Sequence, residues 1–137
     1  MPTAIMFNSG SLTLTQEHQC MADQIKIIED MILAPQYESH QVLAAFRELL
    51  DLAQEHFAHE EESMTGAAFP GSFLHRLDQE YFLRSLRDSI AALVDATERP
   101  PANLCDNLRS WLGFHCRRYD EAGLRFADRQ RASGLTV

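Results

Sequence analysis

Three short clusters of helix-breaking residues divide this sequence into four long segments, and they limit its possible folds more than any other feature. The clusters are Ala34-Pro35, the stretch 66–71 with two glycines and Pro70, and Arg99-Pro100-Pro101. Between them there is almost no Gly or Pro and no alternating strand pattern, which indicates helices. We predict helices over residues 15–33, 39–64, 72–97 and 102–126, an irregular N-terminal arm at 1–14 and a tail at 127–137.

Four helices of this length with short connections favour a single all-α domain. The chain has 137 residues, which suits one domain with one core. Short connections make an antiparallel up-down four-helix bundle the simplest topology. Ser39, Ser72 and Asn103 lie where the second, third and fourth helices should begin, and each is a favourable capping residue.

The charge balance argues against several classes of partner. Asp and Glu number 20 against 12 Lys and Arg, so the formal net charge is −8. A chain this acidic is repelled by nucleic acid and by anionic membrane surfaces, so we expect neither as a partner. No apolar run approaches the roughly 18–20 residues that span a bilayer, and the N-terminus lacks the features of a secretory signal. The expected compartment is the cytoplasm, where the three cysteines would remain free thiols.

Each predicted helix carries an apolar stripe at spacings of three and four, and each stripe contains one histidine. These are His18, His56, His75 and His115. Two stripes continue with another polar residue one turn later: Glu60 follows His56, and Gln79 follows His75, both at i, i+4. Burying imidazoles and a carboxylate without compensation costs several kcal/mol. A bound cation would remove that cost, so the pattern predicts a metal site.

The donor types indicate which metals such a site would hold. His56 and Glu60 point to one side of their helix. Asp120 follows His115 by five residues, which fits a single metal poorly but allows Asp120 to bridge to a second one. Imidazole with carboxylate suits iron, manganese or zinc.

Other metal and catalytic motifs do not fit the sequence. Ferritin-like di-iron proteins need a Glu three residues before a His, and no histidine here has one. The zinc-protease motif fails because His59-Glu60 is followed by Ser63 where a His is required. There is no phosphate-binding loop and no G-x-S-x-G. We expect His40 and His59 to be solvated.

Four motifs resemble those of the hemerythrin family, which includes the bacteriohemerythrins. Residues 56–64, HFAHEEESM, resemble the family run H-F-x-x-E-E-x-x-M. Residues 75–82, HRLDQEYF, resemble H-x-x-x-H-x-x-F, and residues 111–120, WLGFHCRRYD, resemble W-L-x-x-H-x-x-x-x-D. Residues 15–21, TQEHQCM, are loosely similar to D-x-Q-H-x-x-L without its Asp. The four motifs occur in order and at the right spacings, and the resemblance covers about residues 7–126.

This resemblance implies a hemerythrin-like bundle with two iron ions. His18 and His56 would hold one iron. His75, the position of Gln79, and His115 would hold the other. Glu60 and Asp120 would bridge the two ions, together with an oxo or hydroxo group. The implied function is binding or sensing of O2, or of NO, by a protein that is not an enzyme.

Gln79 departs from the family, which has a fifth histidine at that position. Gln79 could ligate through its oxygen, could leave the position to water, or could weaken the second metal so far that only one binds. An extra open position would favour peroxide reduction or oxidase chemistry, which is the alternative function. A second alternative is a metal-stabilised bundle that acts through a protein partner.

Overall fold

The computed structural model describes residues 13–65, 72–95, 98–101, 103–116, 125 and 129. Over this part of the chain it contains four α-helices and no strand, which confirms the predicted all-α class. The helices are α1 (Leu14–Leu33), α2 (Ser39–Thr65), α3 (Ser72–Val94) and α4 (Asn103–His115). The predicted starts of the last three helices agree with the structure to within one residue. The third helix ends three residues earlier than predicted, and the predicted continuation of the fourth to residue 126 lies almost entirely outside the described residues.

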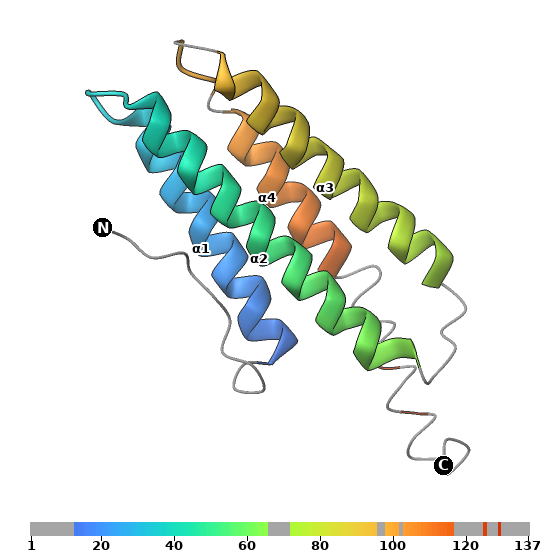
Figure 1. Cartoon of the computed structure of the whole chain (residues 1–137). Helices are drawn as coiled ribbons and strands as arrows, with labels where there is room; N and C mark the ends of the chain where they lie inside the picture. The colour runs from blue at the N-terminus through green and yellow to red at the C-terminus, as the bar shows by residue number, and fades with distance from the viewer. Residues whose placement is uncertain are drawn as a thin grey trace.

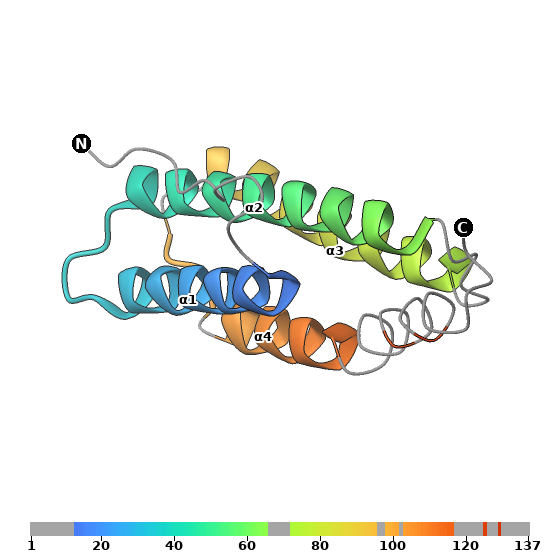
Figure 2. The same ribbon diagram turned by 90° about the horizontal axis from the view of Figure 1, so that it is seen from below.

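The four helices lie side by side with similar axis directions and form a bundle (Figure 1). Each helix packs against the next one in the sequence, and α1 also packs against α4. Figure 2 shows α2 and α3 along one side of the bundle and α1 and α4 along the other. The first and last helices are therefore neighbours, although they are far apart in the sequence.

Local interactions fix both ends of α1. The hydroxyl of Thr13 accepts a hydrogen bond from the backbone N–H of Gln16 at 3.1 Å, and the backbone N–H of Thr13 donates to the Gln16 side chain at 2.8 Å. This reciprocal capping box satisfies two N–H groups that the helix itself cannot. At the other end Ala34 adopts an extended conformation, as residues before proline prefer.

The apolar stripes pack into one core that fills much of the bundle. Its members share relative exposures of 8% or less, and the largest fully buried side chains among them are Phe46, Phe82, Met21, Ile25, Ile28, Ile32, Leu49, Leu52 and Leu86. Arg99 lies at the end of the bundle where α1 ends and α2 begins. Its guanidinium donates to the carbonyls of Ile32 at 2.8 Å and Ala34 at 2.9 Å and lies over the ring of Tyr37.

Within the described part of the chain, Cys20, Cys105 and Cys116 form no disulfide. Cys105 is buried in the core, whereas Cys20 and Cys116 are partly exposed. In the described part of the chain, every helix is too short or too polar to cross a membrane.

Candidate metal centre

Six of the seven residues predicted to bind metal meet at the end of the bundle opposite Arg99. They are His18 at the start of α1, His56 and Glu60 late in α2, His75 and Gln79 early in α3, and His115 at the end of α4. Five are buried, and the His18 side chain is 12% exposed. The seventh, Asp120, lies outside the described residues.

The Glu60 carboxylate lies between two pairs of histidines. Its Oε2 atom is 3.1 Å from Nε2 of His56 and 3.7 Å from Nε2 of His18. Its Oε1 atom is 3.5 Å from Nε2 of His75 and 3.7 Å from Nε2 of His115. The centre therefore contains two groups of three donor atoms that share one carboxylate, and the atoms within each group lie within 4.8 Å of one another.

Glu60 carries a negative charge at this position. Burial raises its pKa, but His115, His18, His56 and His75 lower it by more, so the pKa lies well below the usual value for a glutamate. The carboxylate is therefore ionised in a fully buried environment. An anion buried among imidazoles is a favourable environment for a cation.

A bound cation would satisfy two buried polar atoms of this centre. Nε2 of His56 and Oε2 of Glu60 are both buried, and neither makes a hydrogen bond within the described part of the chain. Buried polar atoms without hydrogen bonds are costly. A metal ion bound by both atoms would remove that cost, so the donor set fits a metal of the class that takes nitrogen and oxygen ligands.

A second carboxylate, Glu17, orients His56 from behind. Glu17 is 2% exposed, and its Oε1 atom accepts a hydrogen bond from Nδ1 of His56 at 2.9 Å. With its Nδ1 atom against Glu17, the His56 ring directs its other nitrogen, Nε2, towards Glu60. Metal-binding histidines are commonly held in this way.

His59 shares this carboxylate, which corrects the prediction that it is solvated. Its Nδ1 atom lies 2.6 Å from the second oxygen of Glu17, and its side chain is only 33% exposed. Glu17 thus connects His56 in the interior with a partly exposed histidine. His40, by contrast, has a side chain that is 76% exposed, as expected.

The other group of donors has an equivalent carboxylate in Asp78. Its Oδ2 atom is 2.5 Å from Nδ1 of His115, and its Oδ1 atom accepts from the indole N–H of Trp111 at 3.2 Å. The contact with Asp78 therefore orients the His115 ring so that Nε2 is directed towards Glu60. Each of the two donor groups has one histidine oriented by a carboxylate on a neighbouring helix.

Neither of these carboxylates was identified from the sequence. Each directly precedes a predicted site residue, as Glu17-His18 and Asp78-Gln79, and adjacent residues on a helix point in different directions. Both therefore fall outside the stripe that identifies the ligands. Each contacts the site through a histidine on another helix. An acidic residue directly before a candidate ligand is the sequence signal that could have identified them.

Gln79 lies in the centre, with its amide N–H directed at the carboxylate. Its Nε2 atom donates to Oε1 of Glu60 at 3.0 Å and is 3.4 Å from both ring nitrogens of His75. The side chain is thus close enough to contact a metal in the second group. In this orientation it presents a donor rather than the carbonyl oxygen that could ligate.

Aromatic side chains line the centre towards the apolar core. Trp111 stacks on His115 with ring centroids 4.5 Å apart and on Phe82 at 4.2 Å. Phe57 contacts the edge of this stack, 5.7 Å from the His115 ring and 5.8 Å from the His56 ring. These rings keep water away from the histidines on the core side and hold their orientation.

Comparisons with protein-family models, with curated proteins and with solved structures gave no match.

Proposed function

We propose that this chain is a hemerythrin-like protein with an antiparallel up-down bundle, which holds two iron ions at the Glu60 centre and binds or senses O2 or NO. The observation that carries the proposal is the Glu60 carboxylate, whose two oxygens face separate pairs of histidines. A single metal would need only one of these groups. Two groups sharing a carboxylate are the arrangement expected of a bridged pair of ions.

In this proposal some residues bind the metals, and others orient the metal-binding side chains. His18, His56 and Glu60 hold one ion, and Glu60, His75 and His115 hold the other. Asp120, which lies outside the described residues, would be a further carboxylate ligand. A pair of ferrous ions at this centre would supply affinity for O2 and NO and the two electrons needed to bind O2 reversibly.

The surroundings of the centre support binding rather than rapid turnover. Glu17 and Asp78 fix the rings of His56 and His115, so the ligands are oriented before metal binds. Phe57 and Trp111 shield the ligands on the core side, which limits the access of water to a bound gas.

Metal analysis combined with absorption spectroscopy tests the proposal. Protein made in iron-replete cells should contain about two iron ions per chain, one for each donor group. Its visible spectrum should change when O2 is removed from the reduced protein and return when O2 is restored. His56→Ala and His115→Ala each remove a ligand from a different group, so each should lower the content towards one iron. His40→Ala, an exposed change on α2, should leave the iron content unaltered.

Two results would overturn the proposal. One is less than about half an equivalent of any metal in the native protein, which would show that the buried donors do not form a site. The other is complete loss of metal in both ligand variants, which would indicate one ion shared by all the donors. That outcome would leave a mononuclear site or a metal-stabilised interaction module.

The orientation of Gln79 favours an alternative, a di-iron peroxidase or oxidase. Because its amide donates to Glu60, the fifth histidine's position in the second group is not filled by a strong donor. Water could occupy that position and exchange with peroxide. The alternative predicts peroxide consumption that depends on iron and continues over many turnovers, whereas the binding protein predicts reversible uptake of O2 without turnover.

A further inference from the structure

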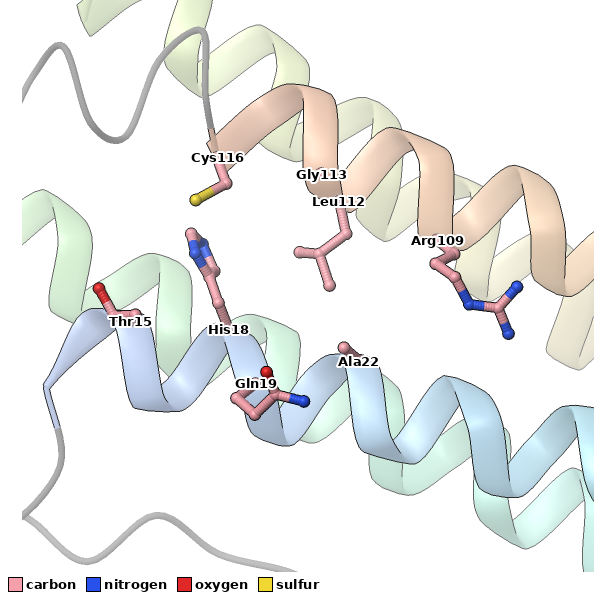
Figure 3. A pocket seen from close by; sticks show the side chains of 8 residues that line it. All are labelled: Thr15, His18, Gln19, Ala22, Arg109, Leu112, Gly113 and Cys116. Carbon is pink, nitrogen blue, oxygen red and sulfur yellow. The ribbon is translucent and has the colours of Figure 1, made fainter.

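A hollow of about 280 Å³ opens between α1 and α4 beside the metal centre (Figure 3). It is lined by Thr15, His18, Gln19 and Ala22 from α1 and by Arg109, Leu112, Gly113 and Cys116 from the α4 side. Thr15, His18 and Cys116 gather at one end, and Arg109 lies at the other. The hollow therefore reaches from solvent to a residue of the metal centre.

Small residues on both helices create this space. Ala22 on α1 and Gly113 on α4 have almost no side chain to fill it. Gly113 lies within α4, where glycine is less stable than alanine by about 0.5–1 kcal/mol. Gly113 thus lowers the stability of α4 at a position where a larger side chain would close the hollow.

The charges around the hollow favour a neutral occupant. The guanidinium of Arg109 is already paired with Glu29 at 3.1 Å and Asp106 at 3.0 Å, so it offers little to an anion. The amide of Gln19 donates to Asp23 at 2.9 Å. The protein's net charge of −8 further disfavours anions.

The size and the polar end restrict the occupant further. An engineered cavity of about 150 Å³ holds benzene, so about 280 Å³ accepts a substituted ring or a molecule of similar bulk. Leu112 and Ala22 provide apolar contact along the length. Thr15 and His18 provide polar atoms at the end next to the metal centre.

We propose that this hollow is a second binding site, which takes a small, neutral and mainly apolar organic molecule whose polar group lies against His18. The occupant lies beside the proposed iron site, and its binding depends on the hollow and not on the metal. An organic molecule could thus be held next to the centre while the metals remain fully ligated. Of the residues that line the hollow, His18 alone also belongs to the donor groups around Glu60.

Phenol and benzoate are suitable probes because they are similar in size and differ in charge at neutral pH. Metal-free, full-length protein is titrated with each while the backbone amide signals of Ala22 and Gly113 are followed by NMR. Phenol should shift both signals and saturate with a dissociation constant on the order of 1 mM, a typical strength for so small a ligand. Benzoate should bind at least about tenfold more weakly, because Arg109, which lines the hollow, is already paired with Glu29 and Asp106. Shifts that do not saturate, or equal binding of both probes, would overturn the proposal.

Filling the hollow provides the matched test. Ala22→Phe and Gly113→Leu fill it from opposite sides, and each should weaken phenol binding at least about tenfold. Ala44→Phe makes the same kind of change at an exposed position of α2 and should leave binding unaltered. Circular dichroism shows which variants retain their helices, and persistence of phenol binding in a folded filled variant would refute the site.

Titration of the native protein with iron, beside the phenol titration, separates this inference from the proposed function. Phenol binding without iron binding would leave the hollow as a site and refute the iron proposal. Iron binding without saturable phenol binding would support the iron proposal and refute the hollow as a binding site.

Discussion

The amide nitrogen of Gln79 donates a hydrogen bond to Oε1 of Glu60 over 3.0 Å. Gln79, at the position where the resemblance to hemerythrins implies a histidine, is therefore engaged with the shared carboxylate, on the side of His75 and His115. A metal bound by Oε1 would have to compete with this hydrogen bond for the same oxygen atom. We therefore expect the second group of donors to bind metal more weakly than the first.

Replacing this side chain should strengthen the second group. Gln79→His supplies an imidazole at i+4 from His75 and removes the amide donor to Glu60. We expect the second iron to bind about 10–100-fold more tightly and the O2-bound form to oxidise more slowly. Anaerobic iron titration and the decay of the oxygenated spectrum measure these effects.

Gln79→Leu is the control for that change. It also removes the hydrogen bond to Glu60 but adds no ligand, so it should tighten the second iron less than Gln79→His does. Equal tightening by leucine and histidine would show that the competing hydrogen bond alone weakens the site. No change in the histidine variant would show that residue 79 does not ligate.

Much of the fold, and the convergence of six candidate ligands, could be predicted because both depend on short-range periodicity. Breakers such as Pro35 set the helix limits, and spacings of three and four placed His56 and Glu60 on one inward face. The capping box at Thr13 was missed, although its Gln16 partner stands at the characteristic spacing.

The parts of the site that could not be predicted depend on contacts between helices. Glu17 was missed because its partner, His56, lies 39 residues later, and no periodicity within α1 reveals that contact. His59 was expected to be solvated because it lies off the inward face of α2. Its Nδ1 atom lies 2.6 Å from the second oxygen of Glu17, a contact between helices that the sequence does not reveal.

Glu17 provides a second prediction. Its two oxygens accept from His56 and His59, whereas glutamine has only one acceptor oxygen. Glu17→Gln should therefore release one of the histidines and weaken metal binding at the first group by about 10–100-fold. Asp51→Asn, an equally conservative change at an exposed position of α2, should leave the affinity unchanged.

The companion change Asp78→Asn separates the two groups. It should weaken binding at the second group, where Asp78 orients His115, and leave the first ion in place. Anaerobic titration with ferrous iron resolves the two binding steps. Loss of both steps in either variant would argue against two separately supported groups.

The cysteines provide a prediction that does not involve metal. Burial raises the pKa of the Cys105 thiol to about 11, with Glu29 acting in the same direction. Because the thiolate is the reactive form, Cys105 should resist iodoacetamide at pH 8 while the protein is folded. Cys20 and Cys116 are partly exposed and should be modified first. Mass spectrometry of partly labelled protein gives the order, and early labelling of Cys105 would show that the core opens readily.

The proposed metal site predicts that the stability of the protein depends on bound metal. A ligand that binds only the folded state at 100 times its dissociation constant adds about 2.7 kcal/mol to the free energy of unfolding. For a chain of 137 residues this corresponds to a rise in Tm on the order of 10 °C. Chelation should reverse that rise in the native protein. His56→Ala should reduce the rise because it removes a buried ligand, whereas His40→Ala should show the full rise because its side chain is exposed. The comparison uses the metal-induced change in Tm of each variant, so the direct cost of each substitution cancels. Equal changes in both variants would show that the stabilising metal binds elsewhere on the chain.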